Sequence, residues 1–81
     1  MPKIFERDGF RVFIYPNDHS PAHVHIWKAE GQVIIELDPI RIRRFEAMRR
    51  KNVSKAVEIV EENQVAFLEK WNEIDEKRSI R

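Results

Sequence analysis

The chain has no cysteine and only two glycines among its 81 residues. Without cysteine it can form neither a disulfide nor a thiolate zinc site, so any metal ion would have to be bound by histidine and carboxylate side chains. No apolar run approaches the roughly 20 residues that a helix needs to span a membrane. The first residues also lack the apolar segment of a secretory signal peptide. We therefore expect a cytoplasmic protein that does not bind membranes.

Neither sign of charge is in excess. Fifteen Lys and Arg against fourteen Asp and Glu give a net charge of +1, which by itself neither favours nor excludes nucleic acid. The two signs are separated along the chain, because residues 41–51 hold six cations and one acid, whereas residues 58–76 hold seven acids and one lysine. This separation indicates an electrically polarised molecule. The candidates for binding nucleic-acid phosphate are Arg41, Arg43, Arg44, Arg49 and Arg50.

The length allows a single domain, residues 1–81. Within it, alternating apolar and polar residues predict strands at about 10–15, 23–28 and 32–37. Ile40 and Ile42 alternate with arginines and fit a short fourth strand, although Ile42 also fits a helical spacing. Gly31 falls between the second and third strands, where we expect it to give a hairpin turn its positive φ.

A long amphipathic helix is predicted at about 48–75, beginning somewhere between 44 and 52, and a charged tail is expected at 76–81. The apolar positions of the helix recur at steps of four and three residues, with only Gln64 polar in the series. They are Val53, Val57, Val60, Phe67, Trp71 and Ile74. The predicted fold class is α+β: a small antiparallel sheet of three to four strands, at about 10–43, covered on one face by the C-terminal helix.

Three histidines lie within seven residues, at His19, His23 and His25. In a strand, His23 and His25 point to one face, and the apolar residues that alternate with them point to the core. If residues 30–31 form a two-residue hairpin loop, His25 lies opposite Glu36 and His23 lies opposite Asp38. Two imidazoles and two carboxylates would then share one face of the sheet, and this arrangement depends on the register.

Two kinds of chemistry suit such a face. In the first, which needs no cofactor, a carboxylate orients an imidazole that serves as general acid or base. The catalytic candidates are His23, His25, Glu36, Asp38 and His19. In the second, imidazole and carboxylate bind a divalent metal such as zinc or manganese. The candidate ligands are His23, His25, Asp18 and Glu36. An ordinary solvated sheet face is the third interpretation, because cross-strand pairs of histidine and carboxylate are common there.

Several short motifs resemble a known family. They are Phe13-Ile14-Tyr15, Asp18-His19-x-Pro21-x-His23-Val24-His25, Leu37-Asp38-Pro39-Ile40-x-Ile42, Glu61-Glu62-Asn63 and Leu68-x-x-Trp71-Asn72. Together they resemble the small prokaryotic family catalogued as domain of unknown function 4160, over nearly the whole chain. The resemblance implies a component of a toxin and antitoxin pair, and so a ribonuclease-like or translation-directed toxin that a small protein partner neutralises. The positions it transfers as site candidates are Asp18, His19, His23 and His25.

Three functions therefore stay open. The sequence leans towards a metal-independent, nuclease-like or RNA-binding protein that uses the histidine hairpin and the arginines. A non-catalytic module that binds a protein partner is the second, and a metal protein of histidine and carboxylate is the third. An exposed strand edge would also allow a homodimer. The sequence identifies neither the substrate nor the partner.

Overall fold

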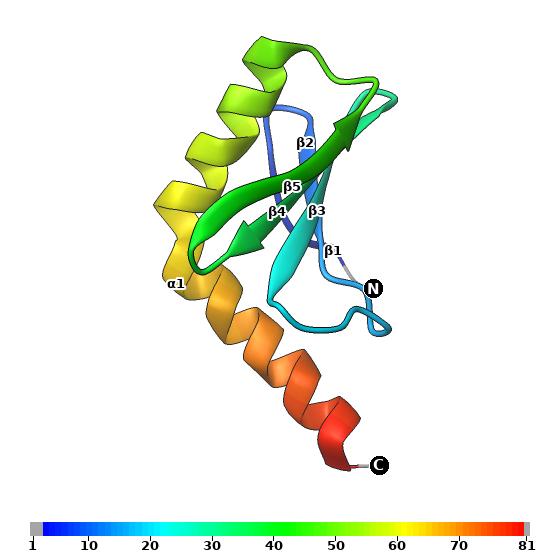
Figure 1. Cartoon of the computed structure of the whole chain (residues 1–81), viewed down its shortest axis with the longest axis vertical. Helices are drawn as coiled ribbons and strands as arrows, with labels where there is room; N and C mark the ends of the chain where they lie inside the picture. The colour runs from blue at the N-terminus through cyan, green and yellow to red at the C-terminus, as the bar shows by residue number, and fades with distance from the viewer. Residues whose placement is uncertain (1–2, 81) are drawn as a thin grey trace.

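The computed structural model describes residues 3–80, with side chains to residue 77, as five strands and one helix (Figure 1). The strands are β1 (Lys3–Arg7), β2 (Phe10–Phe13), β3 (His23–Lys28), β4 (Gly31–Leu37) and β5 (Ile40–Glu46). Each pairs antiparallel with the next, so the sheet order is β1-β2-β3-β4-β5. The α+β class is confirmed, and the expected three to four strands are corrected to five.

The additional strand is β1, which forms an edge of the sheet beside β2. The two strands are joined by Asp8 and Gly9, which both have positive φ, at 53° and 81°. This is the backbone of the Asp-Gly hairpin turn. Phe5 lies on the side of the sheet that faces the helix, and its ring meets Phe67 edge-on with 5.5 Å between the centroids. Ile4 also packs against the core, and Arg7 pairs with Glu62 of the helix over 2.7 Å, so two apolar side chains and an ion pair hold this short edge strand.

The loop of the hairpin between β3 and β4 lies one residue earlier than the sequence suggested, which shifts each pairing partner in β4 by two residues. Its loop is residues 29–30, and it pairs His23 with Glu36 and His25 with Ile34. The positive φ falls on Ala29, at 54°, and not on the glycine. Gly31 is required for another reason: a Cβ there would collide with the carbonyl group of Ala47, whose carbon lies 2.8 Å away. The predicted pairings of His25 with Glu36 and of His23 with Asp38 are therefore wrong.

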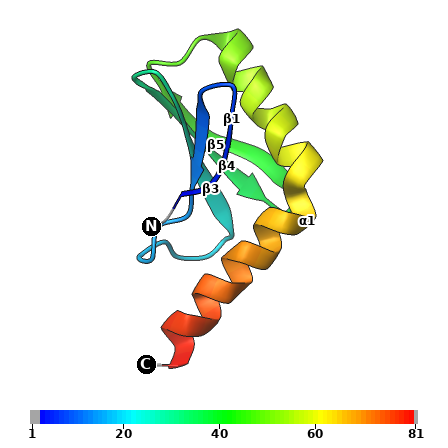
Figure 2. The same cartoon turned by 180° about the vertical axis from the view of Figure 1, so that it is seen from behind.

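Helix α1 (Arg50–Ile80) covers one face of the sheet and leaves the other uncovered (Figures 1 and 2). The apolar series predicted for the helix is buried or half-buried against the core. The helix continues to Ile80, so its predicted end at 75 is corrected, and residue 81 of the predicted tail at 76–81 lies outside the described residues. The buried core joins Val12, Ile14, Val24, Ile26, Val33, Ile35 and Leu37 of the sheet region to Val53, Ala56, Ile59, Val60, Phe67 and Trp71 of the helix. Over the described residues, α1 is not apolar enough to cross a membrane.

The helix is interrupted at Asn63, whose φ of −123° and ψ of 19° are not helical. The side-chain amide of Asn63 donates to the carbonyl oxygen of Ile59 over 2.8 Å, and Gln64 donates to that of Leu37, at the end of β4, over 2.6 Å. The one polar residue in the predicted apolar series thus anchors the helix at its bend. Beyond it, the second half of α1 runs past the end of the sheet, beside the loop that precedes β3 (Figure 1).

Candidate functional site

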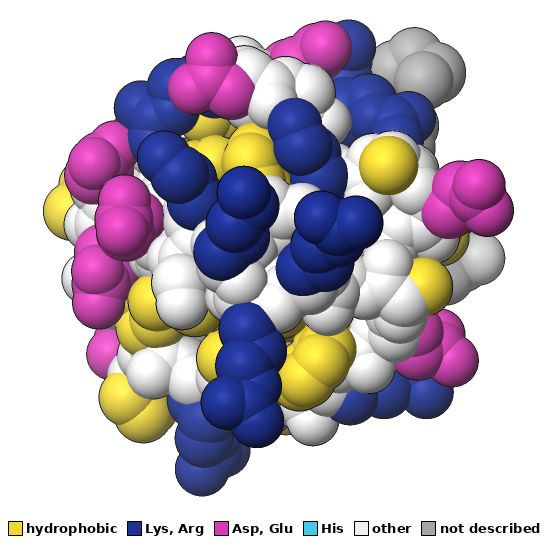
Figure 3. All heavy atoms as spheres, turned by 90° about the horizontal axis from the view of Figure 1, so that it is seen from above, with side chains coloured by type: hydrophobic (Ala, Val, Ile, Leu, Met, Phe, Trp, Pro, Cys, Tyr) yellow, Lys and Arg dark blue, Asp and Glu magenta, His cyan; other side chains and the backbone are white. Residues whose placement is uncertain are grey.

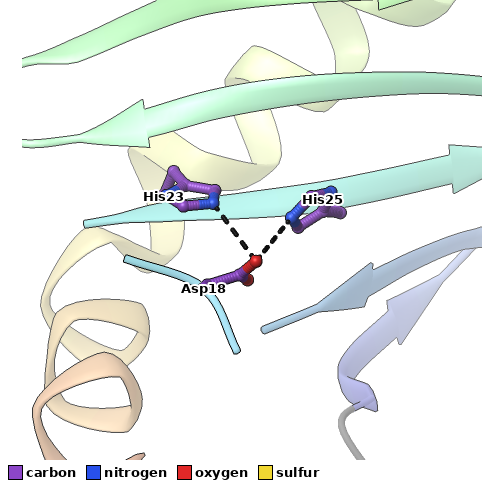
Figure 4. Close-up of side chains that lie close together, drawn as sticks. All are labelled: Asp18, His23 and His25. Atoms are coloured by element: carbon purple, nitrogen blue, oxygen red, sulfur yellow. Dashed lines mark hydrogen bonds and ion pairs between the residues drawn. The ribbon is translucent and has the colours of Figure 1, made fainter. Parts of the chain in front are cut away.

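The loop between β2 and β3 presents Asp18 to the first residues of β3. The backbone N–H of Tyr15 donates to Oδ2 of Asp18 over 2.9 Å, and the N–H of Asp18 donates to the carbonyl oxygen of Tyr15 over 3.0 Å. These reciprocal bonds close residues 15–18 into a turn. They fix the carboxylate while leaving Oδ1 directed at β3 (Figure 4).

Asp18 meets two imidazoles there. Its Oδ1 lies 3.2 Å from Nε2 of His25 and 3.5 Å from Nε2 of His23. The three side chains offer ligand atoms that all lie within 4.8 Å of one another. They are also well shielded, since the side chains of Asp18 and His25 are 13% and 14% exposed and His23 is 4% exposed. A compact cluster of one carboxylate and two imidazoles is thus held largely away from water.

The hydrogen bond at the other nitrogen of His23 determines what this imidazole can do. Its Nδ1 lies 2.8 Å from the carbonyl oxygen of Pro21. A carbonyl only accepts, so Nδ1 carries the hydrogen, and in the neutral ring Nε2 then carries a lone pair. That lone pair faces the carboxylate of Asp18, which also has only lone pairs to offer. A proton or a metal cation between the two atoms would make this contact favourable.

His25 has a polar partner at each ring nitrogen as well. Its Nδ1 lies 3.2 Å from the side-chain amide of Gln32, in the adjacent strand β4. The amide can donate through its nitrogen or, turned about its axis, accept through its oxygen, so it serves either tautomer of the ring. Burial lowers the pKa of His25, and the carboxylate of Asp18 offsets part of that effect. The neutral imidazole that metal ligation requires is therefore favoured.

The structure separates the other candidate residues from this cluster. Glu36 lies opposite His23, but its carboxylate accepts hydrogen bonds from Arg41 over 2.8 Å and from Arg43 over 3.1 Å. These two guanidinium groups lower the pKa of Glu36. His19 is exposed in the loop, and Asp38 is exposed in the turn after β4. Asp18, His23 and His25 are brought together, whereas Glu36, His19 and Asp38 are not part of the group.

The predicted phosphate-binding arginines divide between two regions. Arg41 and Arg43 contact Glu36, and Arg44 pairs with Ile34, so these three lie along β5 on the histidine side of the sheet. Arg49 and Arg50 lie where α1 begins, at the opposite end of the sheet from Asp18. Figure 3, which looks onto that end, shows many Lys and Arg side chains gathered there.

Two contributors to the site were missed in the sequence. Gln32 stands two positions from Ile34 in β4, and strand alternation alone would have placed it on the histidine face. Trp71 was assigned only to the core, yet its indole packs on the imidazole of His23, with 5.2 Å between ring centroids. No local signal reveals this contact, because the two residues lie 48 positions apart in the chain.

The chain matches the model of one protein family, Domain of unknown function (DUF4160), over residues 9–72. It therefore belongs to that family, as the motifs suggested. The matched region includes the loop, β3 and the helix as far as residue 72, so it contains every residue of the cluster. No curated protein and no solved structure matches the chain.

Proposed function

We propose that this member of the family binds a divalent metal ion through Asp18 Oδ1, His23 Nε2 and His25 Nε2. The observation that carries the proposal is the orientation of His23. Its Nδ1–H is held by the carbonyl of Pro21, so its Nε2 lone pair is aimed at a carboxylate that cannot donate. An imidazole fixed in this way by a backbone carbonyl is the usual arrangement of a metal-ligating histidine.

The two distances from Asp18 to the imidazoles suit a metal centre. Zinc is bound by imidazole nitrogen and carboxylate oxygen at about 2.0 to 2.2 Å, which puts neighbouring ligand atoms of a tetrahedron about 3.4 Å apart. Asp18 Oδ1 lies 3.2 and 3.5 Å from the two imidazole nitrogens. Two imidazoles and one carboxylate also suit iron(II). With three protein ligands, coordination positions remain for water or substrate, as in catalytic rather than structural sites.

A metal-independent general base is less well supported by the same geometry. Nδ1 of His23 donates to Pro21 and its Nε2 is covered by Asp18, while the two nitrogens of His25 lie within hydrogen-bond distance of Gln32 and Asp18. Neither ring therefore presents a nitrogen to a substrate proton, which a general base must do. A bound metal would instead use both Nε2 atoms and activate water as a Lewis acid. The toxin and ribonuclease-like roles implied by the family resemblance are finer predictions that an activity assay on RNA would test.

Metal binding is tested directly by titrating the metal-free chain with Co²⁺ and Zn²⁺, using calorimetry and the visible absorption of Co²⁺. We expect one ion per chain, and at a concentration 100 times the Kd a stabilisation of about 2.7 kcal/mol. Asp18→Asn removes the charged ligand with little change in shape and should abolish specific binding. His19→Ala is the matched control, because this histidine lies outside the cluster and should not affect it. Equal losses in the two variants, or no binding by the folded wild type, would overturn the proposal.

A further inference from the structure

Three aromatic side chains lie together on the face of the sheet opposite α1, called the open face below. Phe13 and Tyr15 stack with 5.7 Å between centroids and 6° between ring planes. The indole N–H of Trp27 donates to the Tyr15 hydroxyl over 3.3 Å. All three side chains are partly exposed, and none belongs to the core cluster among the described residues. They form a connected aromatic surface on the face that α1 does not cover.

A row of arginines follows β5 on the same face, with β4 between it and Trp27. The register of β5 on β4 shifts between Ile34 and Ile35. As a result the side chains of two consecutive residues, Arg43 and Arg44, both lie on the open face. Arg43 reaches Glu36 and Arg44 stands opposite Ile34. A regular strand would have pointed one of them to the helix side. The side chain of Arg41 is 68% exposed.

The charge on this face is positive on balance. Glu36 is shared by Arg41 and Arg43, and Glu6 of β1, which stands opposite Arg11, pairs with Lys3 over 2.6 Å. This leaves Arg44 and, from β2, Arg11 against Glu46. Cations and partly exposed aromatic rings on one face are the two components of single-strand recognition, since phosphates pair with guanidinium groups and unpaired bases stack on aromatic rings. A duplex keeps its base faces stacked inside and would have nothing to place on Tyr15 or Trp27.

We propose that the open face binds a single-stranded nucleic acid, with bases on Phe13, Tyr15 and Trp27 and phosphates on the arginines of β5. The open face adjoins the candidate metal site, because the ring of Tyr15 contacts that of His25 with 4.7 Å between centroids. A strand bound here would bring a phosphodiester to the ligands. If the proposed metal function holds, the substrate class of the metal site is a single-stranded nucleic acid. Binding of the strand to the open face itself needs no metal.

The test is fluorescence anisotropy with a labelled ten-nucleotide oligouridine in the presence of EDTA. The double variant Arg41→Gln with Arg44→Gln leaves Arg43 to pair with Glu36, and we expect its Kd to rise about tenfold, with a shallower salt dependence because two phosphate contacts are lost. The matched control is Arg49→Gln with Arg50→Gln, which removes the same charge at the other end of the sheet and should change the Kd less than twofold. Circular dichroism and thermal melting of each variant establish that it is folded.

The aromatic part of the proposal has its own variants. Trp27→Leu should raise the Kd about tenfold, whereas Trp27→Phe keeps a stacking ring and should bind nearly as the wild type does. Asp18→Asn should retain RNA binding while losing the metal, so failure of the metal site and failure of the open face give different results. Equal weakening by the two arginine pairs would sink the proposal. So would duplex RNA that binds as tightly as the single strand.

Discussion

The imidazole of His23 and the indole of Trp71 are packed 5.2 Å apart between centroids, which joins the second half of α1 to the candidate metal site. This contact supplies a spectroscopic reporter. In a Trp27→Phe background, Trp71 is the remaining tryptophan, and we expect Co²⁺ to quench its fluorescence stoichiometrically. Adding Asp18→Asn to the same background should remove the quenching. Quenching that persists in the double variant would place the ion elsewhere.

Because lone pairs of Asp18 and His23 face each other, removing the charge of Asp18 should not destabilise the metal-free chain. In Asp18→Asn, the side-chain oxygen can still accept from the Tyr15 N–H, and the new NH₂ group can donate to a histidine Nε2. We therefore expect the metal-free variant to be as stable as the wild type, or more stable by up to about 1 kcal/mol, since sites built for function often cost stability. Urea denaturation in EDTA measures this, with the exposed Asp38→Asn as control.

If a proton instead bridges Asp18 and His23 in the metal-free chain, Asp18→Asn breaks an ion pair. The free energy of unfolding would then fall by clearly more than 1 kcal/mol, because a shielded charge loses its partner. An unchanged or higher free energy of unfolding for Asp18→Asn therefore indicates a site that needs a cation to be stable, whereas a clear loss indicates an ion pair that is already formed without metal.

The turn between β3 and β4 gives a pair of opposite substitutions. Gly31→Ala directs a Cβ into the backbone of Ala47, which cannot move aside as a flexible side chain would, so we expect a loss of about 2 to 3 kcal/mol. Ala29→Gly removes a Cβ from a residue with φ of 54° and should raise stability by a few tenths to about 1 kcal/mol. The midpoints of urea unfolding report both. A gain from Gly31→Ala would contradict the close approach to Ala47.

The lowered pKa of His25 predicts how stability depends on pH in the metal-free chain. Burial lowers this pKa most, Asp18 raises it, and His23 and Arg43 lower it further. Between the folded pKa and the ordinary histidine value of about 6.5, the unfolded chain binds more protons than the folded one. The free energy of unfolding should therefore decline as the pH falls below about 6.5, and stop declining from this cause below the folded pKa. His25→Gln should flatten that part of the profile, and an unchanged profile would exclude His25 as its source.

Much of the fold follows from local patterns in the sequence. The alternation in β3 correctly put His23 and His25 on the face away from Val24 and Ile26, and the four-and-three spacing identified the buried face of α1. These features depend on residues close together in the chain. β1 was missed because its few apolar residues alternate poorly, although the Asp8-Gly9 turn was a usable signal of a hairpin.

The errors arose where distant segments decide the local conformation. The register of β3 on β4 was two residues out because glycine was assigned the positive φ, whereas Gly31 is needed to make room for Ala47. In the candidate site, Asp18 and the two histidines were found as a local motif. Glu36 was wrongly grouped with them. Its carboxylate is held by arginines of β5, and local sequence patterns do not predict how β5 pairs with β4.

Core residues lie on both sides of the bend at Asn63, since Val60 precedes it and Phe67 and Trp71 follow it. Trp71 also packs on His23 of the candidate metal site. One side chain is thus shared between the core and the site, so a substitution at Trp71 should change the stability of the chain and the surroundings of His23 together.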